Sequence, residues 1–174
     1  MDVLLSDKAF IGIVLSAVEA FKKECTGALL GYNLRDNRIV VEYSFPYQLA
    51  ERSYSQVIIS TKRESRVKEI LPKITQLNYV GEYHSHTQRG GKKATAKLSD
   101  EDEEAIEKCM IEIVVAVNEA KRKTVWKQDP KGMMLSGTIG GYHLTLACYY
   151  KKKDGTIIQC PLLCPYILGF DLTF

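Results

Sequence analysis

The sequence predicts an α/β fold: a single domain with a mixed β-sheet flanked by two main helices and a short third helix. Its 174 residues, 45% of them hydrophobic, are enough for one domain with a buried core. Segments with helical periodicity and segments with strand-like alternation follow one another along the chain, which favours an α/β arrangement. No repeat or linker divides the sequence, so we expect one domain over residues 1–174.

The first part of the chain predicts a helix followed by a hairpin. Apolar residues recur on one stripe over residues 6–23, and Ser6 is a suitable N-cap. The segments GALLGYNL and RIVVEYSF, joined by turn residues at 35–37, predict two paired strands. Residues 54–60 also have the character of a strand.

The central part predicts a second helix, a strand and a long loop. The segment TKRE begins with Thr61 and is a capping box, from which a helix extends to about residue 76. Pro72 is expected to kink or divide this helix. Residues 79–86 alternate as a strand does, and residues 87–98 form a loop.

The last part predicts a short helix and several strands. Residues 99–108 begin with a capping-type Ser-x-x-Asp and predict a helix. The apolar run IEIVVAV at 111–117 is typical of a strand buried on both faces. After a polar loop at 118–131, strands are expected within residues 132–174, two of them joined by the turn sequence KKKDG.

The composition argues against a secreted, membrane or nucleic-acid-binding protein. The formal net charge of +3 is too small for the concentrated basic face that nucleic acids require. The 5 cysteines are odd in number and spread along the chain, which fits a reducing compartment. The N-terminus lacks a signal-peptide pattern, and no apolar run approaches the roughly 20 residues of a membrane span. We therefore expect a cytoplasmic protein with no nucleic-acid or membrane partner.

Two of the 3 histidines stand one residue apart in the segment GEYHSHTQRGGKKATAKLSDED. Side chains alternate along a strand, so His84 and His86 face the same way, with Cβ atoms roughly 7 Å apart. Two imidazoles at this spacing can bind one metal ion, and catalytic zinc takes three protein ligands and a water. Taken separately, the pair also fits two ordinary strand histidines, and Ser99-x-x-Asp102 fits an ordinary helix N-cap.

Together with Glu24, these residues resemble the JAMM (MPN+) metalloproteases, a JAB-domain family that cleaves isopeptide or peptide bonds after ubiquitin-like modifiers. The resemblance includes Glu-x-x-Gly-x-Leu-x-Gly at 24–31 and Val-Gly-x-x-His-Ser-His at 80–86, and it extends over residues 6–117. It implies a JAB/MPN-like fold with the architecture of the cytidine deaminases. It also implies one Zn²⁺ ion with a catalytic water.

The resemblance further implies a role for each motif residue. His84, His86 and Asp102 match the zinc ligands of the family. Glu24 matches its acid/base glutamate, and Ser99 matches the serine that stabilises the tetrahedral intermediate. General chemistry agrees with these roles, because zinc lowers the pKa of bound water to about 7 and a nearby carboxylate can transfer its proton to the leaving amine.

The sequence departs from the family pattern in three places, one of them Thr87, which stands where family members commonly have proline. Residues 87–98 make the segment between the histidines and the Ser-x-x-Asp element longer than usual, and they include the basic stretch RGGKK. We expect this segment to fold over the substrate or to contact an acidic partner surface. Glu82 lies on the same strand face as the histidine pair, and it is an alternative base to Glu24, a partner for a ligand or a solvated side chain.

The sequence thus predicts a zinc isopeptidase that cleaves a ubiquitin-like protein from its conjugates or processes the C-terminus of the modifier. Two other functions remain open. One is a non-catalytic MPN-type scaffold, because the same family contains inactive assembly subunits. The other is a nucleic-acid-associated member of the wider superfamily. The presence of all 5 motif positions favours the enzyme.

Overall fold

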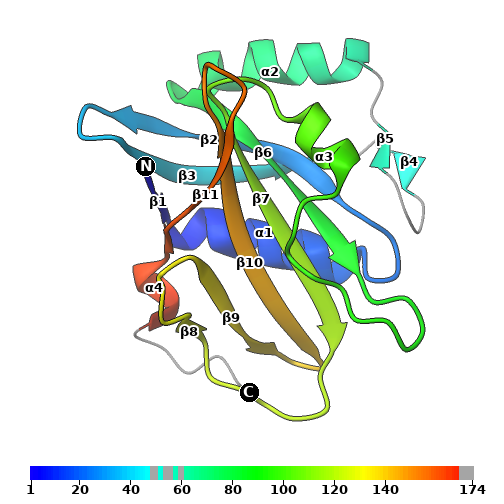
Figure 1. The fold of residues 1–174 in the computed structure, drawn as a ribbon. Helices are drawn as coiled ribbons and strands as arrows, with labels where there is room; N and C mark the ends of the chain where they lie inside the picture. Colours follow the sequence, from blue (N-terminus) through cyan, green and yellow to red (C-terminus); the bar gives the residue numbers. More distant parts are fainter. Residues whose placement is uncertain (48–50, 53–56, 59–60, 169–174) are drawn as a thin grey trace.

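The fold is built on a ten-stranded mixed β-sheet, as the sequence predicts (Figure 1). The computed structural model describes residues 1–47, 51–52, 57–58 and 61–168. The strands of the large sheet are β1 (Asp2–Leu5), β2 (Thr26–Leu34), β3 (Arg38–Pro46), β6 (Asn78–Thr87), β7 (Ile111–Glu119), β8 (Lys127–Gln128), β9 (Met134–Ile139), β10 (Tyr142–Lys151), β11 (Ile157–Cys160) and β12 (Leu162–Leu163). Their order is β12–β1–β3–β2–β6–β7–β10–β9–β8, with β11 paired to β10. The strands β4 (Glu51–Arg52) and β5 (Val57–Ile58) form a separate pair.

The helices are α1 (Asp7–Glu19), α2 (Thr61–Thr75), α3 (Asp100–Ala105) and a short α4 (Pro165–Leu168). Ser6 caps α1, since its hydroxyl oxygen accepts a hydrogen bond from the Ala9 amide at 3.1 Å. The helix α1 ends at Glu19, earlier than predicted, and Lys22 beyond it has φ 78°, a left-handed conformation that does not continue a helix. The helix α2 runs on through Pro72 to its last turn and is not divided there.

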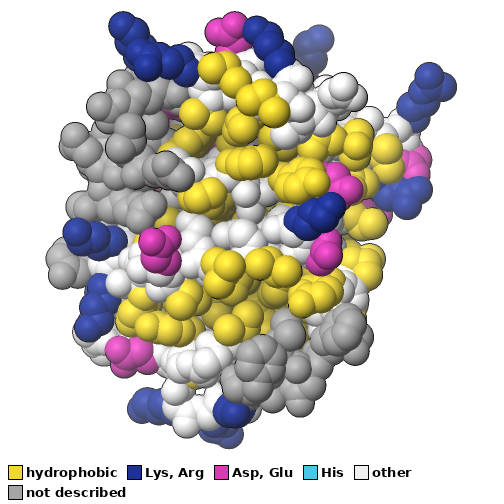
Figure 2. All heavy atoms as spheres, turned by 180° about the vertical axis from the view of Figure 1, so that it is seen from behind, with side chains coloured by type: hydrophobic (Ala, Val, Ile, Leu, Met, Phe, Trp, Pro, Cys, Tyr) yellow, Lys and Arg dark blue, Asp and Glu magenta, His cyan; other side chains and the backbone are white. Residues whose placement is uncertain are grey.

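The main core lies between α1 and one face of the sheet. In Figure 1 this helix crosses behind the central strands. Its Phe10 ring packs edge-on against Trp126, with ring centroids 5.0 Å apart. From behind, apolar side chains form patches between charged groups on the outer surface (Figure 2). On α1, the apolar side chains of Ile11 and Leu15 are 42% and 64% exposed. The largest fully buried side chains of the core include Phe10, Ile13, Leu29, Ile113 and Leu144.

A smaller apolar cluster covers the opposite face of the sheet. Val114 and Ala116 of β7 are buried there with Ala147 of β10, against Ala96 from the long segment 87–98. The strand β7 is therefore buried on both faces, which explains its nearly continuous apolar sequence. The segment 87–98, called the inserted segment below because it is longer than the family pattern predicts, forms part of the fold because it covers this second face.

Some predicted features fall where the structure gives no description. Of the predicted strand 54–60, only Val57–Ile58 is described, as β5. The Thr61 side chain, which was predicted to cap α2, is not among the described side chains. Residues 169–174 also lie outside the described residues. Within the described ranges, no helix is both long and apolar enough to span a membrane.

Candidate metal centre

The histidine pair lies on β6, in the centre of the sheet. This strand pairs antiparallel with β2 and parallel with β7, and His84 and His86 stand beside Val114 and Ala116 of β7. Both histidines share the face of the second cluster, because alternate residues of a strand point the same way. Tyr83, the residue before His84, points instead into the main core. The sheet thus presents both imidazoles on the face opposite α1.

Two motif glycines allow the strands around the site to approach closely. At Gly81, which has φ 152°, an added Cβ would lie 1.9 Å from the Ile111 carbonyl oxygen of β7. At Gly27, an added Cβ would lie 2.2 Å from the Phe45 oxygen and 2.6 Å from the Tyr83 ring. Any larger residue at these positions would force β6 or β2 away from its neighbours.

Asp102 is directed at the histidines by the capping box that begins α3. The Ser99 amide donates to the Asp102 carboxylate at 2.7 Å, and the Asp102 amide donates to the Ser99 hydroxyl oxygen at 3.2 Å. These two bonds hold the carboxylate at the start of the helix. The helix dipole accounts for the neighbouring acids Asp100, Glu101 and Glu103, whereas Asp102 also contacts both imidazoles.

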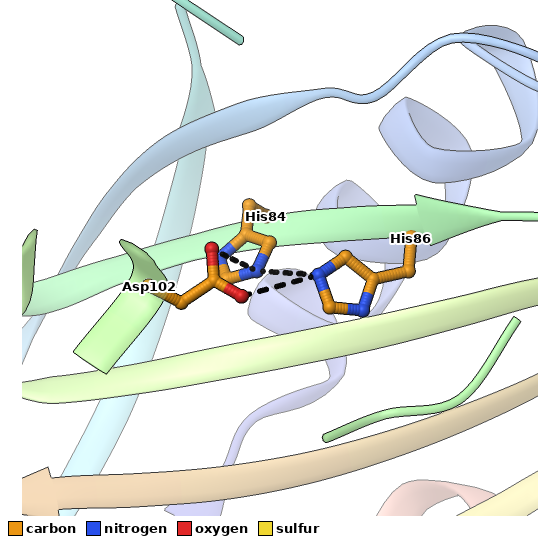
Figure 3. A group of neighbouring side chains, drawn as sticks. All are labelled: His84, His86 and Asp102. Atoms are coloured by element: carbon orange, nitrogen blue, oxygen red, sulfur yellow. Dashed lines mark hydrogen bonds and ion pairs between the residues drawn. The ribbon is translucent and has the colours of Figure 1, made fainter. Parts of the chain in front are cut away.

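One ligand atom from each of the three predicted ligands lies within 4.8 Å of the other two, close enough for all three to share a metal ion (Figure 3). The two histidine Nε2 atoms are 3.2 Å apart, Asp102 Oδ1 lies 3.5 Å from His84 Nε2, and Asp102 Oδ2 lies 3.4 Å from His86 Nε2. Metal–ligand distances of about 2.1 Å give a tetrahedron with edges of about 3.4 Å. Two imidazole nitrogens and one carboxylate oxygen are a donor set that zinc accepts in catalytic sites. The residues present therefore fit a zinc ion.

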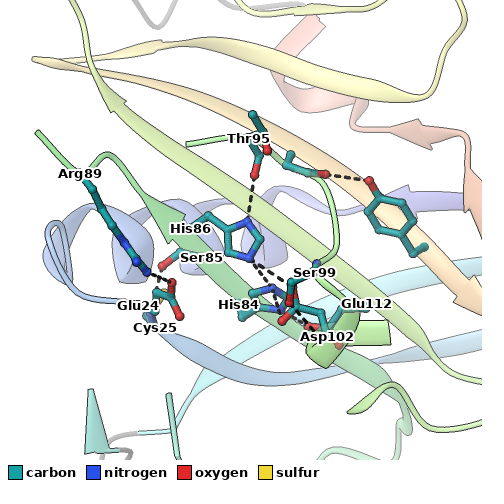
Figure 4. Close-up of polar contacts among 12 residues, drawn as sticks. Glu24, Cys25, His84, Ser85, His86, Arg89, Thr95, Ser99, Asp102 and Glu112 are labelled. Atoms are coloured by element: carbon teal, nitrogen blue, oxygen red, sulfur yellow. Dashed lines mark hydrogen bonds and ion pairs between the residues drawn. The ribbon is translucent and has the colours of Figure 1, made fainter. Parts of the chain in front are cut away.

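Hydrogen bonds on the far side of each ring orient the imidazoles. The Nδ1 atom of His84 lies 2.6 Å from a carboxylate oxygen of Glu112, and that of His86 lies 2.9 Å from the Thr95 carbonyl oxygen (Figure 4). A carbonyl can only accept, so His86 carries its proton on Nδ1 and leaves Nε2 free as a ligand. Glu112 was not among the residues predicted from the sequence, although it is the one acid within the apolar run of β7.

The carboxylates around His84 shift the pKa values of the site. Burial lowers the pKa of His84, but hydrogen bonds with Asp102 and Glu112 outweigh it and raise the value to about 10. Partial burial of Asp102 is likewise outweighed by its contacts with the two histidines, which hold its pKa well below the usual range. Burial raises the pKa of Glu112, although the contact with His84 opposes the shift. His84 and Asp102 thus stabilise each other's charged forms.

We expect zinc binding to strengthen as the pH rises. With a pKa of about 10, the His84 imidazole of the metal-free chain keeps a proton at neutral pH that must leave before Nε2 binds a metal ion. Below this pKa, each pH unit should therefore tighten binding by up to about tenfold. Competition with a chromophoric chelator between about pH 6 and 7.5 measures this slope. A pH-independent affinity would contradict the raised pKa.

Replacing Glu112 with Gln should weaken zinc binding about tenfold, because outer partners of a metal-ligating histidine set its orientation and basicity. Glutamine keeps the size of the side chain but removes the charge that faces His84. Zinc affinity by chelator competition is the measurement. Glu119→Gln is the matched control, since Glu119 lies at the exposed end of the same strand. Equal affinities of the two variants would show that Glu112 has no role in positioning His84.

Glu24 lies beside the histidine pair, just before β2 begins. Its position depends on Ser85, the middle residue of the motif, which is fully buried. The Ser85 amide donates to the Cys25 carbonyl oxygen at 2.9 Å, and the Cys25 amide donates to the Ser85 hydroxyl oxygen at 2.9 Å. The Glu24 side chain is 12% exposed, and its carboxylate lies 3.4 Å from the Arg89 guanidinium (Figure 4). Burial raises the pKa of Glu24, while His86, His84 and Arg89 oppose the shift.

Glu82, the alternative base, is held by other groups. Its Oε1 atom accepts hydrogen bonds from the hydroxyls of Tyr79 at 2.7 Å and Tyr47 at 3.0 Å. The Lys68 ammonium of α2 lies 3.4 Å from the same oxygen. Glu82 therefore connects α2 to β6, and of the two glutamates Glu24 is the one with an ion pair to the inserted segment.

All the predicted site residues border one cleft of about 850 Å³. Its lining includes Glu24, His84, His86, Ser99 and Asp102. The Ser99 hydroxyl oxygen accepts a bond in the helix cap, so its hydrogen remains available to donate into the cleft. The cleft combines three candidate metal ligands, a carboxylate and a hydroxyl, a set of groups suited to hydrolysis.

A mixed sheet with a histidine pair on its central strand and an aspartate from the following helix defines a JAB/MPN-type domain. Residues 1–95, more than half of the chain, match the family described as JAB1/Mov34/MPN/PAD-1 ubiquitin protease. The chain belongs to this family. The matched region includes Glu24, His84 and His86 and ends before Ser99 and Asp102, so the placement of the last two rests on the geometry of the capping box.

Comparison with solved structures supports the same fold. The solution structure of protein DSY2949 from Desulfitobacterium hafniense is similar, with a TM-score of 0.63 and 18% sequence identity. The similarity covers 93% of this chain and 92% of that chain, so it includes the C-terminal strands beyond the family match. Comparison with curated protein sequences gives no match.

Proposed function

We propose that the protein is a zinc-dependent peptidase that cleaves isopeptide or peptide bonds after a ubiquitin-like modifier. The observation that carries the proposal is the convergence of His84, His86 and Asp102 with Glu24 in one cleft. Family membership supports the substrate class, because the family is described as a ubiquitin protease. The extended tail of the modifier would bind along the cleft, on the face of the sheet that carries the histidine pair.

Each residue of the site has a separate task in this reaction. Zinc, when bound by the two histidines and Asp102, would supply a water of lowered pKa and polarise the scissile carbonyl. Glu24 takes a proton from the attacking water and delivers it to the leaving amine, and its raised pKa suits this exchange. Ser99 donates a hydrogen bond to the oxygen that gains charge. Glu112 and the Thr95 carbonyl keep the imidazoles oriented.

Cleavage of two types of substrate tests the proposal. Zinc-loaded protein should cleave a ubiquitin-like protein fused to a peptide, or the same protein joined to a lysine side chain, and a chelator should stop the reaction. Metal content measured in parallel should be about one zinc per chain. Bound zinc with no cleavage of either substrate type, across several modifiers, would instead support the non-catalytic scaffold.

A further inference from the structure

The inserted segment 87–98 is held in a defined conformation beside the cleft. Arg89 and Lys92 pair through two backbone hydrogen bonds of 3.0 and 2.9 Å, which close a tight turn. The Asn118 side chain of β7 bonds to both backbone groups of Ala94, at 2.8 and 3.1 Å. The Tyr149 hydroxyl donates to the Ala96 oxygen at 2.8 Å. These anchors hold the basic residues of the segment at the wall of the cleft.

The basic residues of the segment 87–98 that line the cleft, called the lysine wall below, differ in whether a carboxylate pairs with them. Arg89, Lys92 and Lys93 all line the cleft and are exposed. Arg89 is paired with Glu24 at 3.4 Å. Within the described part of the chain, no carboxylate lies within ion-pairing distance of Lys92 or Lys93. Two cations of the wall are thus available to a ligand.

The rest of the cleft is acidic, and this limits the ligands it accepts. Its other charged residues, apart from the two histidines, are Glu24, Glu64, Glu82, Glu101, Asp102 and Glu112. A polyanion such as a nucleic acid would meet these carboxylates along much of its length and be repelled. A single carboxylate placed at the lysine wall would avoid them.

We propose that Lys92 and Lys93 form a subsite for a carboxylate of the peptide substrate, close to the bond that is cleaved. The inference rests on the proposed function, since the peptide enters the cleft for cleavage. The carboxylate belongs to an acidic side chain or to a free C-terminus, which present the same group. The insertion thereby makes the protein selective for acidic substrates.

Equilibrium binding to zinc-loaded protein tests the subsite without any cleavage. Three peptides of the same uncharged sequence carry an uncharged fluorophore: one is amidated, one is amidated with a single Glu, and one has a free C-terminal carboxylate. Tighter binding of the Glu peptide than of the plain amidated peptide would identify a side-chain carboxylate as the ligand. Tighter binding of the peptide with a free C-terminus would identify the terminal carboxylate. We expect a preference of about fivefold, the effect of one or two partly solvated ion pairs, and its loss in about 0.5 M salt.

Matched lysine variants separate a local subsite from the net charge. The preference should disappear in Lys92→Gln/Lys93→Gln. It should persist in Lys152→Gln/Lys153→Gln, which removes the same charge from the exposed turn between β10 and β11. Equal loss in both variants, or no preference in the unmodified protein, would overturn the proposal. Tighter binding of a short single-stranded oligonucleotide through Lys92 and Lys93 would also overturn it.

The result of the peptide-binding experiment does not depend on the result of the cleavage assay. A carboxylate preference without cleavage of any modifier would leave the subsite in place and remove the proposed peptidase function. Cleavage by a protein that binds all three peptides equally would support the peptidase and reject the subsite.

Discussion

Replacing Glu24 with Gln should reduce cleavage roughly 1,000-fold while the zinc content stays at about one ion per chain. The amide cannot take a proton from the attacking water, so the step assigned to Glu24 is lost. The ligand atoms of His84, His86 and Asp102 are unaffected, because their hydrogen-bond partners are other residues. Cleavage rates measured with a modifier–peptide fusion, together with elemental analysis, give both values.

Glu82→Gln is the control for this experiment. Glu82 borders the same cleft, but its Oε1 atom accepts bonds from Tyr79 and Tyr47. Glutamine retains a carbonyl oxygen that can accept both bonds, so we expect a change in rate of less than about tenfold. Full activity of Glu24→Gln with an inactive Glu82→Gln would show that the two carboxylates have the opposite roles.

Replacing Asp102 with Ala should weaken zinc binding on the order of 100-fold or more, since even the outer partners of a metal ligand contribute 10- to 100-fold. The substitution removes the carboxylate that lies 3.5 and 3.4 Å from the two histidine nitrogens. Cleavage at low free zinc should fall in parallel. Chelator competition measures the affinity, and elemental analysis after dialysis measures retention.

Asp102 also caps α3, and a second variant separates the two roles. Asp102→Asn keeps an oxygen that accepts the Ser99 amide bond, whereas a neutral amide is a poor zinc ligand. Loss of zinc in both variants would assign the effect to the ligand. Normal zinc affinity of Asp102→Asn would show that Asp102 serves as a helix cap and that another group completes the metal site.

Local sequence patterns predicted much of the fold. The alternation around His84 and His86 predicted that they share a strand face, and the Ser99–Asp102 box predicted a helix start; both features are present. The double-sided burial of β7 followed from its apolar run. These predictions succeed because strand alternation and helix capping involve residues only a few positions apart.

Failures of prediction occurred where distant segments decide the outcome. The sequence did not show that α1 ends at Glu19, nor did it predict the parallel strand β1, which depends on pairing with β3 and β12. Pro72 was expected to kink or divide α2, but the helix continues through it to Thr75 and is not divided.

By itself, the sequence identified the candidate metal ligands of this protein: two imidazoles and a carboxylate in local motifs, with Glu24 as their distant partner. Only the tertiary structure decided how these groups are supported. The parallel register of β6 and β7 places Glu112 beside His84. The Cys25 amide donates a hydrogen bond to Ser85, 60 residues away in the sequence. The inserted segment brings Lys92 and Lys93 to the cleft because Ala96 is buried against the second face of the sheet. Such contacts depend on which strands become neighbours, and that is settled by packing the whole sheet.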